Sequence, residues 1–253
     1  MGVWYYVKVR TKSPIAGGVP TTLQALTGRN ITEVKRKSGW SIVMAVTKAK
    51  TKEQAIRILT EWDWNEVKKA AEKYPDDIKS QGLTVFRRDE NGIPFVKAHM
   101  IKSMIKETMA ALGYQKKRVD QVHHGVWVYP IDRIEGDKIV YRNDQIIHIY
   151  EDENMTKVVK DADGIYETYL TTVTPKGPRT TYKYSEVILP PKYLHFLIYV
   201  SEGEKGKPVL AEDELKHILI ESGMTNGIGS GRPMGFGRYD LIEFKRVINV
   251  SSS

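Results

Sequence analysis

The 253-residue chain contains no cysteine. Disulfide bonds, thiolate metal sites and cysteine nucleophiles are therefore excluded, and we expect a cytoplasmic protein. No run approaches the ~20 apolar residues that a membrane-spanning helix needs, so we expect no membrane partner. The first residues, MGVWYYVKVR, enter a strand pattern directly, without the basic segment and apolar block of a secretion signal.

Metal-ligand patterns and serine-nucleophile motifs are also missing. The pair Asp76-Asp77 and the run Glu151-Asp152-Glu153 are acidic but lack ligand spacing, so we expect neither a metal nor another cofactor. The serine of Gly229-Ser230-Gly231 lacks the strand-to-helix context of a hydrolase nucleophile. Binding proteins and metal-independent enzymes are the classes that remain.

The composition is that of a soluble globular protein, with 41% hydrophobic and 28% charged residues. Lys and Arg total 39 against 31 Asp and Glu, which gives a formal charge of +8 and an isoelectric point near 9.3. A basic surplus of this kind favours nucleic acid or another polyanion as the partner.

Hydrophobic periodicity and turn residues divide the chain into strands and helices. The pattern predicts strands over 3–10, 40–47, 83–87, 125–134, 138–150, 165–173, 193–200 and 238–247, and helices over 51–74, 98–112 and 211–223. Residues 21–39 form a polar loop, residues 174–184 form a basic projecting loop rich in Pro and Gly, and the terminal VSSS is expected to be disordered.

This order, without its insertions, is the βαββαβ unit of a ferredoxin-like fold. We therefore expect an α+β protein with an antiparallel sheet, helices on one face and the other face open for a ligand. Residues 1–253 are interpreted as a single domain. It would carry an inserted subdomain over 21–82 and a thumb-like excursion over 151–190.

Residues 227–238 read GIGSGRPMGFGR and lie between the last expected helix and the last strand. Five glycines in eleven positions permit positive φ and let the backbone approach a ligand closely. Exposed amides of such a loop form an anion-binding nest, and Arg232 and Arg238 add guanidinium groups suited to phosphate. We expect a polyanion-binding loop; the alternative is a glycine-rich turn without a ligand.

Two nucleotide-binding motifs are excluded by the order of elements. A Rossmann fingerprint follows a strand and opens a helix, whereas this loop follows a helix and opens a strand. A Walker A loop needs Gly-Lys-Ser/Thr before a helix, which is absent here.

The segment GIGSGRPMGFGRYDLIEF resembles the C-terminal glycine-rich loop and final strand of the RAMP superfamily, the CRISPR-associated proteins that process or carry guide RNA. The family motif, G-x-G-x-x-R-x-x-G-x-G, matches Gly227, Gly229, Arg232, Gly235 and Gly237. DENGIPFVKAHMIKSMIKETMAAL is similar to the turn and first helix of the guide-carrying subunits. Lys102 is the corresponding lysine, although their Ser-Ser-Leu-Lys-Gly stretch is not kept. TTYKYSEVILPPKYLHFLIYV is similar to the lead-in to a late strand of the same subunits.

The resemblance implies a guide-RNA-carrying backbone subunit of a CRISPR-type ribonucleoprotein in antiviral defence. Its partners would be RNA, other RAMP subunits, or further copies assembling along the RNA. Some such subunits use an aspartate after the first strand to cut target RNA, and residues 11–39 contain none, which argues against that activity. The residues expected to bind RNA are Gly227, Gly229, Ser230, Gly231, Arg232, Gly235, Gly237, Arg238, Lys97, Lys102, Lys106, Arg179 and Lys183.

Other RAMP proteins are metal-independent endoribonucleases that process the guide transcript with a histidine general base near the 2′-hydroxyl. No histidine precedes His99, at the start of an expected helix, so His99 is the catalytic candidate. His123-His124 is the next candidate, and His195 and His217 are expected to be packing residues. A divergent non-catalytic scaffold, which keeps the loop only for folding, is the third alternative.

Overall fold

The computed structural model describes residues 2–20, 72–75, 78, 83–174, 177–203 and 206–253. The chain divides into two compact units. The core unit consists of Met1–Ala16, Asp89–Ala162 and Ile188–Ser253, and the second unit consists of Gly17–Arg88 and Asp163–Val187. The loop expected over 21–39, the strand over 40–47 and most of the helical segment 51–74 lie outside the described residues.

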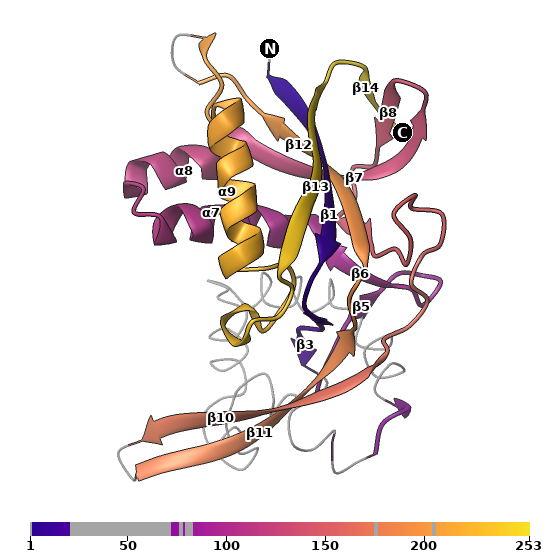
Figure 1. Cartoon of the computed structure of the whole chain (residues 1–253), viewed down its shortest axis with the longest axis vertical. Coiled ribbons are helices and arrows are strands. Elements are labelled where there is room, and N and C mark those ends of the chain that lie inside the picture. The colour runs from indigo at the N-terminus through magenta and orange to yellow at the C-terminus, as the bar shows by residue number, and fades with distance from the viewer. Residues whose placement is uncertain (1, 21–71, 76–77, 79–82, 175–176, 204–205) are drawn as a thin grey trace, which may run out of the picture. The chain divides into compact units, whose positions relative to one another are not determined.

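The core unit is an α+β fold built on a six-stranded sheet with the strand order β13-β1-β12-β7-β8-β14 (Figure 1). Its elements are β1 (Val3–Thr11), β2 (Ile15–Ala16), β6 (Pro94–Lys97), α7 (Ala98–Ala111), α8 (Lys116–Gly125), β7 (Val126–Glu135), β8 (Lys138–Tyr141), β9 (Ile146–His148), β12 (Tyr193–Val200), α9 (Glu212–Thr225), the 3-10 turn η2 (Arg232–Met234), β13 (Tyr239–Val247) and β14 (Val250–Ser252). β1 pairs antiparallel with β12 and β13, and β12 pairs antiparallel with β7. Without the short additions, the order β1-α7-β7-β12-α9-β13 is the ferredoxin-like βαββαβ core, so that prediction is confirmed.

Alternation along β1 explains how the sheet holds its helices. Tyr5, Val7 and Val9 are buried, and α7 and α9 lie on one side of the sheet (Figure 1). Side chains of a strand alternate between the two faces, so this spacing places a continuous apolar row under the helices. The stripe that includes Ile101 and Ile105 of α7 is fully buried and completes the core.

A small polar network joins α7 to α9. The hydroxyl oxygens of Thr108 and Ser222 lie 2.8 Å apart, and the Asn226 amide donates to Thr108 Oγ1 at 2.7 Å. The buried hydroxyl of Tyr239 donates to the backbone oxygen of Leu219 at 2.8 Å. These buried polar groups have partners, so their hydrogen bonds offset the cost of desolvation while the network fixes the end of α9.

The sheet face opposite the helices is partly covered, which corrects the expectation of an open face. A buried cluster of Tyr6, Ile131, Ile139 and Leu197 lies there. Partly buried side chains pack against this cluster, among them Trp4, Tyr141 and Val250 of β14. Strand β14 pairs with β8 in parallel, although only residues 248 and 249 separate it from β13 at the other edge of the sheet. The terminal residues Val250–Ser252 are thus a strand, and the expectation of disorder was wrong.

Two further differences from the sequence reading concern short elements of the core unit. Helix α8 was not predicted, because KKRVDQVHHG has only two apolar side chains and buries only Val122 and Gly125. The strand expected over 138–150 is divided into β8 and β9, and the turn between them is stabilised by Asp144, whose Oδ1 accepts from the Ile146 amide at 2.9 Å. The longer elements lie within two residues of their predicted bounds.

The second unit has a sheet with the order β10-β11-β4-β3. Its elements are β3 (Val19–Pro20), β4 (Thr84–Val85), β5 (Arg87–Arg88), β10 (Gly164–Thr174) and β11 (Gly177–Ile188). The projecting loop expected over 174–184 is therefore mostly strand β11, because its Thr- and Tyr-rich sequence favours pairing with β10 beyond the turn.

The carboxylate of Glu186, in β11, organises the described part of the second unit. It is fully buried and accepts hydrogen bonds from the Tyr74 hydroxyl at 2.8 Å, the Phe86 amide at 2.8 Å and the Arg88 guanidinium at 2.9 Å. The Lys73 ammonium lies 3.1 Å away. These donors satisfy the hydrogen-bonding capacity of the buried carboxylate, and they depend on it in turn.

We expect Glu186→Ala to destabilise the second unit by about 3–5 kcal/mol, because it removes the buried carboxylate that pairs with the nearly buried Arg88. Hydrogen exchange at the Phe86 amide would report the loss directly. Glu186→Gln is the matched control, because it keeps the shape and an acceptor and should cost less. Equal protection at Phe86 in the parent and the alanine variant would contradict the expectation.

Candidate nucleic-acid interface

The glycine-rich loop of residues 227–238 lies between α9 and β13 and is held against the end of β1. The Ser13 hydroxyl donates to the Gly235 oxygen at 2.7 Å and accepts from the Arg238 amide at 2.8 Å. The Lys12 amide donates to the Arg238 oxygen, and the Gly237 amide donates to the Pro14 oxygen at 2.8 Å. The first strand therefore sets the position of the loop.

The glycines of this loop serve the fold in different degrees. Gly237 has φ +70°, and a Cβ there would lie 1.8 Å from the backbone oxygen of Ile228. Gly235 has φ +85°, but a Cβ there would meet nothing nearer than the Arg238 guanidinium at 3.9 Å. The other three glycines expected to bind RNA also have positive φ and close neighbours of their own chain: Gly227, Gly229 and Gly231.

Most backbone amides of the loop already have protein acceptors. Those that donate within the core unit are the amides of Gly227, Ile228, Ser230, Met234, Gly235, Gly237 and Arg238. The sequence suggested an anion nest of exposed amides, and these amides are not exposed donors. A phosphate at this loop would be met chiefly by side chains.

The two loop arginines point to different surroundings. Arg232 Nη2 lies 2.9 Å from Glu107 Oε1 on α7, so its charge is partly balanced. Arg238 is exposed, and among the described residues no carboxylate lies within ion-pair distance of it. Only Arg238 is thus free of a described acidic partner.

Two cations at the end of β1 were missed by the sequence analysis. Arg10 Nη2 lies 3.2 Å from Oδ2 of Asp240, and Lys12 Nζ lies 3.2 Å from Oδ1 of the same carboxylate. Burial opposes ionisation of Asp240, but hydrogen bonds from these two cations hold its pKa below the ordinary value. Arg10 and Lys12 therefore share one carboxylate, and Arg238 adds a third cation at this strand end that has no acidic partner among the described residues. No sequence motif marks Arg10 or Lys12, because the pairing of β1 with β13 brings them to the loop.

The residues expected on the first helix lie on or beside α7. Lys97 ends β6, and His99 is exposed in the first turn, where its amide donates to Gln145 Oε1. Lys102 and Lys106 follow one turn apart. Burial, and then the neighbouring Lys106, lower the pKa of Lys102.

Arg179 and Lys183 both lie in β11, in the second unit, and were expected in a projecting loop. Burial lowers the pKa of Lys183, which is half-buried and not a fully solvated cation. The two are described with that unit alone, apart from the glycine-rich loop of the core unit.

His195 and His217 have different environments, although both were expected to pack. His217 is exposed on α9, so that expectation was wrong. His195 is 9% exposed, lies edge-on to Tyr6 and Tyr150, and has no hydrogen-bond partner at Nδ1. Burial, and then the Lys8 ammonium, lower the pKa of His195 to about 4.

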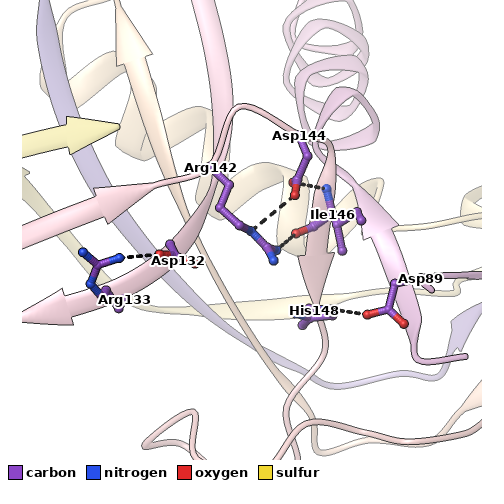
Figure 2. Close-up of polar contacts among 7 residues, drawn as sticks. All are labelled: Asp89, Asp132, Arg133, Arg142, Asp144, Ile146 and His148. Carbon is purple, nitrogen blue, oxygen red and sulfur yellow. Dashed lines mark hydrogen bonds and ion pairs between the residues drawn. The ribbon is translucent and has the colours of Figure 1, made fainter. Parts of the chain in front are cut away.

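Figure 2 shows a polar cluster around β9 that no sequence signal indicated. His148 Nε2 lies 3.0 Å from Asp89 Oδ2, although 59 residues separate the two. Arg142 donates to the Ile146 oxygen at 2.6 Å and lies 3.4 Å from Asp144. These contacts hold the neighbouring turns against β9, so we interpret the cluster as structural.

Metal binding and membrane insertion find no structural candidates in the described residues. In that part of the chain, no three His, Asp or Glu side chains gather as metal ligands. Nor is any helix there long and apolar enough to cross a membrane.

Gly237→Ala and Gly235→Ala form a matched pair that tests the packing of the loop. Gly235→Ala should cost only the ~1–2 kcal/mol of a left-handed backbone carrying a Cβ. Gly237→Ala should cost clearly more, because the loop must also separate where Gly237 contacts Ile228. Thermal unfolding would measure both, and equal losses would contradict this account of the loop.

Stability should depend on pH through His195. The unfolded chain takes up this proton near pH 6.5 and the folded chain near pH 4, so stability falls as the pH decreases between those values and levels off below them. The loss from this group is at most ~3 kcal/mol. Urea unfolding of the parent and His195→Gln, at about pH 7 and about pH 4.5, should give a smaller pH dependence in the variant. An unchanged dependence would exclude His195 as its source.

Comparisons with known proteins find similarity among solved structures. No family model and no curated protein matches the sequence. Among solved structures, the fold is similar to a chain of the "Cryo-EM structure of the Type III-B Cmr-beta bound to cognate target RNA", with 12% sequence identity and a TM-score of 0.39. The match covers 97% of this chain and 61% of that chain, so this chain spans about three fifths of its neighbour's length.

Proposed function

We propose that the chain is an RNA-binding protein of the RAMP class that acts as a guide-RNA-carrying backbone subunit of a CRISPR-type ribonucleoprotein. The observation that carries the proposal is the loop of residues 227–238, which has the family's motif and joins the last helix to the last strand of a ferredoxin-like core. Its hydrogen bonds to β1 make it a rigid platform. A rigid loop orients Arg232 and Arg238 before a ligand arrives, which lowers the entropic cost of binding.

Charge around the loop supports a polyanion as the ligand. Arg10 and Lys12 share the carboxylate of Asp240, and Arg238 has no acidic partner among the described residues, so this end of β1 has a surplus of positive charge. Guanidinium groups bind phosphate with fixed geometry, and neutralised phosphates release counter-ions. We infer that RNA phosphates contact Arg238 first, while Arg232 exchanges its bond with Glu107 for a phosphate.

Further contacts with the RNA backbone would come from the other predicted residues. Lys97 ends β6, and Lys102 and Lys106 lie in α7, where no carboxylate of the described residues forms an ion pair with either of them. Arg179 and Lys183 would contribute from the β10–β11 hairpin of the second unit. Binding by several separate cations suits a strand of RNA better than a small anion.

The alternative is a guide-processing endoribonuclease with His99 as its general base. The observation that favours it is the exposure of His99 at the start of α7, where a 2′-hydroxyl can reach the imidazole. Such an enzyme would also bind RNA, so cleavage products separate the two functions.

RNA binding across a salt series tests the proposal. The parent should bind single-stranded RNA with an affinity that falls steeply with salt. Arg232→Ala/Arg238→Ala should bind more weakly, with a slope shallower by about 1.4 if each arginine neutralises one phosphate. Fluorescence anisotropy with a labelled oligonucleotide would measure both slopes.

Lys216→Ala/Lys138→Ala is the matched control, because it removes two cations from α9 and β8, away from the loop. Its slope should stay near that of the parent. Equal slopes for the parent and the arginine variant would contradict the role of the loop. RNA fragments made by the parent and absent with His99→Ala would favour the endoribonuclease instead.

A further inference from the structure

An exposed indole stands at the end of a row of aromatic side chains in the core unit. Trp4 of β1 is directly opposite Tyr199 of β12, and Tyr199 is directly opposite Trp127 of β7. The ring centres are 4.8 Å and 5.8 Å apart along this row. Trp127 is 38% exposed, whereas Trp4 is partly buried among Tyr129 and Tyr141.

The pairing of β7 with its neighbouring strands explains why Trp127 remains accessible to solvent. Strand β8 pairs with β7 only over Ile131–Glu135, and β14 extends the sheet beyond β8. Among the described strands, the first residues of β7 pair with β12 alone, so Trp127 lies at an open edge of the sheet. Tyr199 supports the indole from within the sheet, which limits the rotamers that the ring can adopt.

One cation lies against this indole, and a second follows one turn further along the same helix. Lys102 Nζ lies 5.4 Å from the centre of the Trp127 ring, within the range of a cation–π contact. Lys106, one turn further along α7, has its Nζ 3.2 Å from Nδ1 of His123 on α8. The two ammonium groups have no carboxylate partner among the described residues, so the patch keeps its positive charge.

His123 positions Lys106 without competing for a phosphate. The ammonium of Lys106 donates to Nδ1, which requires a neutral imidazole. The Lys106 charge, with smaller effects from burial, Lys102 and His124, lowers the pKa of His123, so the ring is neutral at physiological pH. Two hydrogens of the ammonium stay available for a ligand.

We propose that Trp127, Lys102 and Lys106 form a base-stacking subsite for single-stranded RNA. A nucleobase stacks on the exposed face of the indole, and the two ammonium groups contact the adjoining phosphates. Aromatic rings beside cations bind single strands in this way because every base has a π-face. This subsite rests on the proposed RNA-binding function and adds a contact to the bases, which the glycine-rich loop does not supply.

The test compares a uridine oligonucleotide with an abasic one of equal length. Trp127→Ala should weaken binding of the base-bearing RNA by roughly tenfold and leave the abasic strand nearly unchanged, because only the former loses stacking. Trp127→Phe should retain most of the affinity. Lys102→Ala/Lys106→Ala should weaken both strands, and Lys216→Ala should weaken neither.

Fluorescence provides a second readout that does not depend on the alanine variant being folded. The chain has five tryptophans, and the difference between the parent and Trp127→Phe isolates the emission of Trp127. Base-bearing RNA should quench this difference signal, and the abasic strand should not.

The outcomes separate this subsite from the proposed function. If the parent binds RNA and Trp127→Ala binds both strands as well as the parent does, the subsite is wrong and RNA binding stands. If base-bearing and abasic strands bind the parent equally, the patch is a general polyanion surface and the subsite is again wrong. If the parent binds no RNA at moderate salt, the proposed function fails and the subsite with it.

Discussion

The structure of the candidate interface depends on one close contact, the return of the glycine-rich loop against its own beginning. Gly237 passes so near the Ile228 oxygen that no side chain fits between them, and the Ile228 amide donates to the Gly237 oxygen at 2.8 Å. Ser13 and Pro14 then bind the outer part of the loop to β1. Most amides of the loop donate to protein acceptors in this closed arrangement, so the arginine side chains are the groups left to bind a ligand.

Placement of charge matters more here than the net surplus. Several cations of the core unit are balanced at the surface, such as Arg133 by Asp132 and Glu135, and Lys157 by Glu151. Unbalanced cations gather at the loop end of β1 and along α7 instead. Two surfaces with free positive charge, one rich in glycine and one beside an exposed indole, fit a ligand that offers both phosphates and bases.

Long periodic segments could be predicted from sequence because the spacing of their apolar residues indicates a helix or a strand without reference to the rest of the chain. Helix α7 has a complete apolar stripe, and β1 and β12 have the β-branched and aromatic residues of central strands. Helix α8, with few apolar side chains, has no such signal. Strand β14 depends on an edge that β8 provides from more than a hundred residues earlier in the chain, so no local pattern could indicate it.

The candidate site was predictable only where residues are adjacent in sequence. The loop motif marked Arg232 and Arg238, but the contacts of Arg10 and Lys12 arise from strand pairing, and Trp127 meets Lys102 through the packing of α7 near β7. Residues that become neighbours only through the packing of distant segments cannot be recognised from their spacing in the sequence. The sequence by itself determined the α+β class, the order of elements and the glycine-rich loop, because propensity and periodicity are local. Only the tertiary structure decided which cations lack acidic partners and which aromatic ring reaches solvent, because burial and charge pairing depend on how distant segments pack.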